Sequence, residues 1–433
     1  MVQTPTISHQ KFYRQVNFLL ILVFFVKLGG FFTWSENINI TRVIKVFSRV
    51  MMTVAIFGIY KRILRQGAVA SFQWKHSLSP VFYGLYLLLG LISFLWSTNV
   101  GYSALQLFMD AECFLFAYYF IGCFILLDHY FPSSGIRLSN VMAQAVFLML
   151  MIFVIGQYAA PNQFYRLTHG GEEARLGGYI MNPNELGMLG AVGVSCLIFN
   201  LPNKRVRIYT IIQIVILLYA IVMTGSRSTT IGCMLITFFH INQSKNKKLK
   251  WIMYAGALMV IPVAINKMVV KENAGGLDEV MNMTGRIPFW HALLTEGLPK
   301  EPLLGFGFMR IAYGEYFSSV HSYAAGMTHN TFIQVIMNLG FIGFGIVLFQ
   351  MFFTLRGYFS KHEKQKNLLF VGLIIPVMIN SFTEFGIFGE TNYGILFYQL
   401  LIFYLSLSIN GRLTPVEKLF LLKKRPELTR SIP

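Results

Sequence analysis

The chain has 433 residues, of which 55% are hydrophobic and 15% aromatic, while only 12% are charged. This charged share is about half that of an average soluble protein. A soluble fold of this length could not bury so much apolar surface, and the same composition excludes disordered, collagen-like and small disulfide-rich proteins. We therefore expect an all-α polytopic membrane protein.

A helix needs about 20 apolar residues to cross the hydrocarbon core of a bilayer. The apolar runs predict about twelve spans, near residues 16–32, 43–60, 80–96, 103–126, 140–159, 185–201, 207–223, 228–241, 249–266, 329–353, 367–385 and 391–409. The eighth of these runs is short, which is typical of a broken or buried helix.

The 36 Lys and Arg residues outnumber the 18 Asp and Glu residues, which gives a formal charge of +18. In a soluble domain this excess would indicate nucleic acid. Here most basic residues lie in short loops between apolar runs, so we expect no nucleic-acid partner. If the N-terminus is cytoplasmic, 24 of the 36 basic residues fall in cytoplasmic segments, ten fall outside, and Lys27 and Arg49 lie within spans. This asymmetry predicts that both termini are cytoplasmic.

Four segments follow from the spacing of the spans. We expect spans one to nine in residues 1–266, a large outer loop with surface helices in 267–328, spans ten to twelve in 329–409, and a basic cytoplasmic tail in 410–433. A second long outer loop covers residues 160–184. Loops of this length in a compact fold are usually functional.

Two polar segments lie at the outer ends of predicted spans. The segment RLGGYIMNPNELG brings Arg175 and Asn184 to the mouth of span six, and TGSRSTTIG brings Arg227 to the outer end of span eight. Each has an alternative interpretation, because an arginine at a span end often reaches for lipid headgroups and an asparagine often caps a helix.

The large loop contains the segment MTGRIPFWHALL, with Arg286 and Trp290. The apolar pattern of Ile287, Trp290, Leu293 and Leu294 predicts a helix that lies on the membrane surface.

The segment THNTFIQVIMNLGFIGF places His329 and Asn330 at the outer start of span ten, with Gly340 and Gly343 about three turns deeper. Such glycines often serve only as close-packing positions between helices.

The chemistry of these residues points to a phosphorylated substrate at the outer face. Arginine presents a fixed fork of donors that binds phosphate bidentately, so Arg175, Arg227 and Arg286 could hold a diphosphate and stabilise it as a leaving group. A nearby histidine could accept a proton from an incoming hydroxyl group. Arg42 and Lys45 share one face of span two and could extend the anion-binding track, although contact with headgroups also explains them.

We expect no metal and no other cofactor. The three aspartates (Asp110, Asp128 and Asp278) are scattered, and no cluster of His and Cys residues with zinc spacing is present. Glycine patterns for nucleotide phosphates are also absent, so neither ATP nor a nucleotide sugar is an expected partner.

These motifs resemble those of the O-antigen ligase and O-antigen polymerase superfamily. The pattern HN-x9-G-xx-G that begins at His329 is similar to the ligase signature in spacing and place. The SR pair that ends at Arg227 and the GR pair that ends at Arg286, followed by Trp290, are similar to the two essential arginines of the family. The motifs cover residues 175–345, and the twelve-span plan extends the resemblance over most of the chain.

The resemblance implies an inverting, metal-independent glycosyltransferase of the GT-C type in the bacterial inner membrane, with a large periplasmic loop between spans nine and ten. The donor would be a glycan on undecaprenyl pyrophosphate, with Arg227 and Arg286 on the diphosphate and His329 as base. Arg175, Asn184, Asn330, Trp290, Arg42 and Lys45 would contact substrate. A ligase would transfer the polysaccharide to lipid A–core, whereas a polymerase of O-antigen or of another surface polysaccharide would join lipid-linked repeat units. The HN signature favours the ligase.

A transporter or flippase for lipid-linked sugars is an alternative from another class. A transporter should carry ionisable residues near the middle of the membrane. Only Asp110, Glu112 and Arg49 lie deep in the predicted spans, which favours an enzyme. The sequence does not specify the sugar, its linkage, the oligomeric state or a regulatory partner.

Overall fold

The computed structural model describes residues 7–168, 173–200, 208–243, 247, 250, 251, 254, 286–308, 328–360, 364–384 and 386–409. The long helices are α1 (Ile7–Gly29), α2 (Ile38–Arg65), α3 (Leu78–Ile92), α4 (Val100–Tyr130), α5 (Leu138–Ala159), α7 (Pro183–Asn200), α8 (Ile208–Thr224), α9 (Arg227–Gln243), α14 (Thr331–Phe359), α15 (Lys364–Thr383) and α16 (Tyr393–Ser406). Two short helices are α6 (Pro161–Phe164) and α12 (Arg286–Ala292), which continues into a π-helical turn (Leu293–Gly297). The strands form two antiparallel pairs, β1 (Phe72–Trp74) with β4 (Leu407–Ile409) and β2 (Tyr165–Thr168) with β3 (Glu173–Leu176).

The helical prediction is confirmed at the level of fold class. Within the described residues, six helices are long and apolar enough to cross a membrane, and three shorter apolar helices accompany them. A helix covers each predicted span except the ninth, residues 249–266, which lies mostly outside the described residues. The count of twelve spans therefore stays a prediction, as do the segment boundaries. Most of the 267–328 loop and all of the 410–433 tail also lie outside the described residues.

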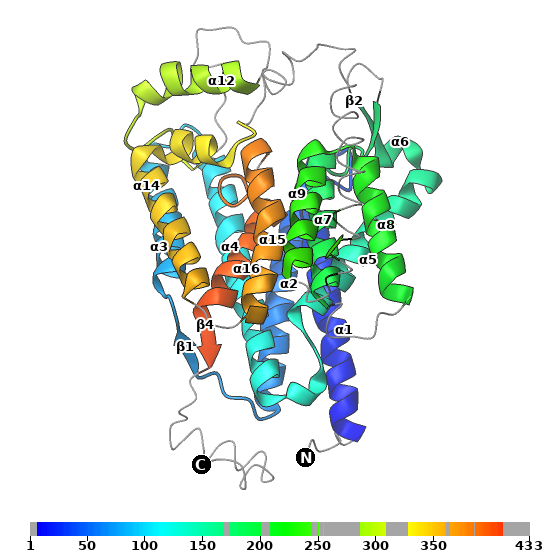
Figure 1. The fold of residues 1–433 in the computed structure, drawn as a ribbon. Coiled ribbons are helices and arrows are strands. Elements are labelled where there is room, and N and C mark those ends of the chain that lie inside the picture. Colours follow the sequence, from blue (N-terminus) through cyan, green and yellow to red (C-terminus); the bar gives the residue numbers. More distant parts are fainter. Residues whose placement is uncertain are drawn as a thin grey trace.

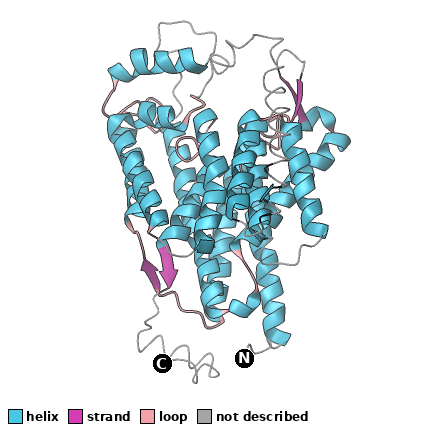
Figure 2. Ribbon diagram, viewed as in Figure 1, coloured by secondary structure: helices cyan, strands magenta, loops and turns pink. Residues whose placement is uncertain are grey.

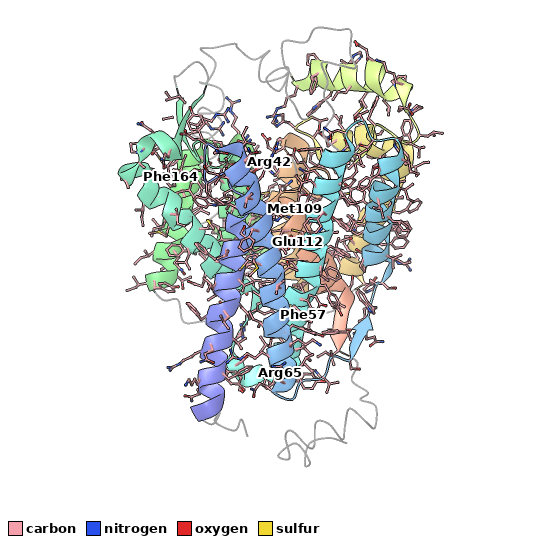
Figure 3. All side chains as sticks on the ribbon, turned by 180° about the vertical axis from the view of Figure 1, so that it is seen from behind. Arg42, Phe57, Arg65, Met109, Glu112 and Phe164 are labelled. Atoms are coloured by element: carbon pink, nitrogen blue, oxygen red, sulfur yellow. The ribbon has the colours of Figure 1, made fainter. Side chains whose placement is uncertain are left out.

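The helices form an elongated bundle with two distinct ends (Figure 1). One end carries α6, α12 and the β2–β3 pair, and we call it the α12 end. The opposite end carries the β1–β4 pair and the start of α1. Figure 2 shows that the strands are confined to these two ends, while helices form the body between them. In Figure 3, Arg42 lies toward the α12 end of α2, Glu112 lies midway along the bundle, and Arg65 lies toward the opposite end.

The apolar sequence runs explain both the core and the outer faces of the bundle. Aromatic rings fill the core, as where Phe24 of α1 stacks on Phe120 of α4 with ring centroids 4.9 Å apart. Other large apolar side chains point outward, and Phe47 on α2 and Ile208 on α8 are 65% and 78% exposed. Apolar faces of this extent are typical of helices that contact lipid hydrocarbon.

Asparagine side chains begin four of the helices at the α12 end. Asn37, Asn99, Asn330 and Asn392 each accept hydrogen bonds from backbone N–H groups in the first turn of α2, α4, α14 and α16. The first four N–H groups of a helix lack partners within the helix. These caps satisfy part of that need where the chain enters the bundle.

The helix α14 is broken at Gly340, whose φ of 61° is non-helical. A Cβ atom at this position would lie 2.3 Å from the backbone of Leu303, so only glycine fits. The break frees backbone N–H and C=O groups of α14, and these groups form hydrogen bonds with the segment 302–308 instead of within the helix. Four hydrogen bonds of 2.8–3.2 Å join Phe306 N to Met337 O, Gly307 N to Asn338 O, Phe341 N to Pro302 O and Ile342 N to Leu303 O. Gly340 is therefore a backbone break and not a simple packing position, and it sets the first turns of α14 apart from the rest of the helix.

Candidate active site

A buried carboxylate, Glu384, lies at the centre of the polar residues at the α12 end. It follows the last residue of α15, and its side chain is only 3% exposed. The chain beyond it folds back into the bundle, where Ile387 and Phe388 are buried. Gly386 N donates to Thr331 Oγ1 at 2.9 Å, which ties this turn to the start of α14. The turn thereby holds Glu384 inside the protein.

Glu384 joins three elements through its two oxygens. His329 Nδ1 lies 2.5 Å from Oε2, while Arg286 Nη2 and Asn184 Nδ2 donate to Oε1 at 3.2 and 2.9 Å. Arg286 also donates through Nη1 to the carbonyl oxygen of Thr383. The side chains come from α12, α7 and the residue pair before α14, so one carboxylate gathers groups that are far apart in the sequence.

The ionisation of Glu384 follows from its surroundings. Burial disfavours the charged form, but the hydrogen bond and charge of His329, the guanidinium of Arg286 and the amide of Asn184 outweigh burial and hold the pKa of Glu384 below its usual value of 4.5. An ionised carboxylate can only accept hydrogen bonds. The proton between the two residues therefore belongs to His329 Nδ1, and the second ring nitrogen, Nε2, is the one that can act as a base.

The backbone around His329 is fixed by a tight local structure. His329 has a φ of 53°, which is uncommon for a residue with a side chain. Thr328 Oγ1 donates to Asn330 O at 2.7 Å, and Asn330 Oδ1 accepts from the N–H groups of Phe332 and Ile333. These bonds start α14 directly after His329. They also place the positive end of the helix dipole beside the site, where it favours an anion.

Arg175 belongs to the same network through Asn184. It lies on β3, and its Nε donates to Thr224 O at 2.7 Å while Nη2 donates to Asn184 Oδ1 at 2.8 Å. Gly225, with a φ of 59°, packs against the Arg175 side chain. Asn184 thus bridges Arg175 and Glu384.

Two glycines, Gly177 and Gly178, directly follow the strand β3 that carries Arg175. A Cβ atom on Gly178, whose φ is 62°, would lie 1.9 Å from Gln163 O. A Cβ atom on Gly177, whose φ is 130°, would lie 2.6 Å from Met181 O. These two close backbone contacts explain the glycine pair in the RLGGY sequence.

Arg227 is the first residue of α9 and is half-buried. Within the described residues its guanidinium makes no hydrogen bond or ion pair, in contrast to Arg175 and Arg286. Two residues further on, Thr229 Oγ1 donates to Asn184 O at 3.4 Å and to Ser226 Oγ at 2.8 Å. The start of α9 is therefore held next to Asn184, and Arg227 stands at the edge of the network.

The other predicted residues occupy different places. Trp290 donates through Nε1 to Thr328 O at 2.6 Å, which fastens α12 to the His329 turn. The Asn330 side chain is occupied as the cap of α14. Lys45 donates to Thr33 Oγ1 at 3.2 Å and interacts electrostatically with two glutamates, while Arg42 is exposed at the α12 end of α2 (Figure 3). Arg42 and Lys45 form no hydrogen bond with the Glu384 network in the described part of the chain.

Comparison with known proteins bears on this arrangement. Residues 212–348 match the family model described as O-antigen ligase. This match supports the resemblance of the chain to the O-antigen ligase and O-antigen polymerase superfamily. The matched O-antigen ligase region contains Arg227, Arg286 and His329, and it ends before Glu384. No curated protein matches the chain. At this coarse level the match is consistent with a membrane enzyme that acts on polysaccharides and with lipid-linked substrates.

The sequence analysis did not identify Glu384. Glu384 falls at the end of the predicted span 367–385, and nothing in the apolar pattern shows that the chain beyond it folds back into the bundle. One signal was present. Acidic residues are rare in this chain, with 18 in 433 positions, and Glu384 is one of the few at the outer end of a predicted span.

Proposed function

We propose that the chain is a ligase-type glycosyltransferase that moves a polysaccharide from undecaprenyl pyrophosphate to lipid A–core at the periplasmic face of the inner membrane. The observation that carries this proposal is the network at the α12 end, in which Glu384 links His329, Arg286 and, through Asn184, Arg175. The O-antigen ligase match over residues 212–348 supports the same reaction class.

The geometry supports a single displacement at the sugar. With Nδ1 directed to Glu384, Nε2 of His329 would take the proton of the acceptor hydroxyl as its oxygen attacks the anomeric carbon. The bond from that carbon to the diphosphate oxygen breaks, and the diphosphate leaves with the electron pair. Attack from the face opposite the leaving group inverts the anomeric centre. Glu384 stabilises the imidazolium that forms, in the way that a buried carboxylate supports histidine in other enzymes.

The arginines provide the charge that a diphosphate leaving group needs. In this proposal Arg227 and Arg286 contact the diphosphate, and Arg175 adds positive charge one step further from the reacting atoms. Fixed donors aimed at developing charge can replace a metal ion in this task. Within the described residues no group of three His, Cys, Asp or Glu side chains is placed to hold a metal, and the proposed mechanism uses arginine alone.

The proposed orientation places the α12 end in the periplasm. This orientation follows from the sequence, in which 24 of the 36 basic residues fall in the segments predicted to be cytoplasmic. Trp290, Asn330, Asn184, Arg42 and Lys45 remain proposed contacts for the glycan or the lipid headgroup at the periplasmic end.

The test is a reconstituted assay with purified lipid-linked donor and lipid A–core acceptor. Release of undecaprenyl pyrophosphate together with a glycosylated acceptor supports the proposal, and the His329→Ala variant should release none. Movement of the donor between leaflets without cleavage would identify a transporter instead. Products that lengthen on the lipid carrier, with unmodified core, would identify a polymerase. A deletion strain makes the same distinction, because loss of a ligase leaves long glycan on the carrier.

A further inference from the structure

Three contacts join the start of α14 to the end of α15. His329 bonds to Glu384, Thr331 accepts from Gly386, and the ring of Phe332 packs on the ring of Phe382. The first two contacts are polar and belong to the site described above. The third is apolar, and the mechanism does not use it. We call Phe332 and Phe382 the α14–α15 ring pair.

The ring pair is partly exposed although it lies beside buried charges, because Phe332 is half-buried and Phe382 points outward. Its centroids are 5.2 Å apart with a tilt of 44°, and Phe382 is 51% exposed. Glu384, two residues later in the sequence, is only 3% exposed. An apolar surface and a buried polar network therefore meet within three residues of the chain.

The cationic part of the site is joined directly to this apolar surface. Arg286 donates to the carbonyl oxygen of Thr383, the residue that follows Phe382. The guanidinium of Arg286 is therefore bound to the backbone of the residue next to the exposed ring of Phe382. The helices α14 and α15 that carry the ring pair have different packing neighbours. Helix α14 packs mainly on α3, while α15 packs on α7 and α9. Figure 1 shows both helices with their site ends toward α12.

A ligand that matches both halves of this surface must be an amphiphile with an anionic head and an apolar chain attached directly to it. We propose that the α14–α15 ring pair binds the isoprene units next to the diphosphate of the lipid-linked donor, so that the donor enters the site from the bilayer between α14 and α15. This inference rests on the proposed function, because it takes the diphosphate to lie at Arg286. A water-soluble sugar donor would gain nothing from an exposed phenylalanine at this position.

The kinetic test compares two exposed phenylalanines. Phe382→Ala should raise KM for the lipid-linked donor about tenfold, the expected effect of losing one large apolar contact, with kcat nearly unchanged. The control is Phe47→Ala, because Phe47 is 65% exposed on α2, which packs on α1 and α4. Equal KM values for the wild type and both variants would overturn the inference and leave the proposed function standing. An inactive wild type would instead contradict the proposed function.

A binding test covers the case in which Phe382→Ala fails to fold. A photoreactive benzoylphenylalanine at position 382 should crosslink to a radiolabelled polyprenyl diphosphate in vesicles. An excess of unlabelled polyprenyl diphosphate should suppress this product, and an excess of phosphatidylglycerol should not. The same substitution at position 47 should give no suppressible product. Suppression by both lipids alike at position 382 would mean that the ring faces only bulk lipid, which rejects the inference whether or not transfer occurs.

Discussion

The Glu384→Gln variant tests the catalytic network most directly. The substitution keeps the size of the side chain and removes its charge. In the wild type the two carboxylate oxygens accept from His329, Arg286 and Asn184. Glutamine offers one acceptor oxygen and one NH₂ donor in their place. It cannot accept from both His329 and Arg286, so one of these contacts is lost and the other loses its charge assistance.

The magnitude follows from the two charge-assisted contacts. Each hydrogen bond of this kind contributes about 1.5–3 kcal/mol, so weakening both costs about 3–6 kcal/mol. Since about 1.4 kcal/mol corresponds to a factor of ten in rate, kcat/KM should fall about 10²–10⁴-fold. The loss should appear mainly in kcat, because the orientation of the base matters most when the proton moves.

The assay is donor turnover by purified protein in vesicles, with thermal unfolding in detergent as a measure of folding. The matched control is Glu390→Gln, because Glu390 lies at the same end of the bundle, half-buried, and accepts from Tyr102 at 2.8 Å. This control should lose less than about tenfold in kcat/KM. A folded Glu384→Gln protein with wild-type kcat would refute the role that we assign to the carboxylate.

Further predictions test other parts of the site and fold. Arg286→Lys keeps the charge but loses the fork that reaches both Thr383 and Glu384, so transfer should fall roughly 10²-fold, measured as released diphosphate. Wild-type turnover should be unchanged in EDTA, and loss of turnover would reveal a metal requirement. Gly340→Ala should lower the free energy of unfolding by at least about 2 kcal/mol because of its positive φ and the close Leu303 backbone, whereas Gly345→Ala, with open space around it, should not. The pKa of Glu384 lies below 4.5, so its stabilising effect is present above about pH 4.5 and is lost as pH falls through the folded-state pKa. The difference in Tm between wild type and Glu384→Gln should therefore shrink below about pH 4.5.

The sequence predicted the features that depend on local composition. Long apolar runs predicted the helices, because a membrane span must satisfy its backbone hydrogen bonds internally. The polar segments at the span ends and in the large loop indicated Arg175, Arg286 and His329, which the structure places in one hydrogen-bonded network.

The features that depend on tertiary structure could not be predicted. No sequence pattern marks the GFGF segment at 305–308 as structurally important, yet Phe306 and Gly307 donate backbone hydrogen bonds to the helix broken at Gly340. Such pairing joins segments whose spacing in the sequence carries no periodicity. The role of Glu384 could not be predicted for the same reason, because it depends on a turn that folds into the bundle instead of outward.

The charges in the middle of the bundle bear on the choice between an enzyme and a transporter. Lys27 Nζ donates to both oxygens of Glu112 at 2.5 and 2.6 Å, and Arg49 Nε lies 3.6 Å from the same carboxylate. Arg49 also donates to Met109 O at 2.9 Å and lies over the ring of Phe31. Lys27 and Arg49 are 0% and 3% exposed, so this cluster is closed on itself midway along the bundle (Figure 3). A transporter needs ionisable groups that exchange partners as access alternates between the two faces. Lys27 and Arg49 are thus paired with Glu112 inside the bundle, whereas Arg227 has no partner in the described residues at the α12 end. This charge distribution favours a reaction at one face of the membrane.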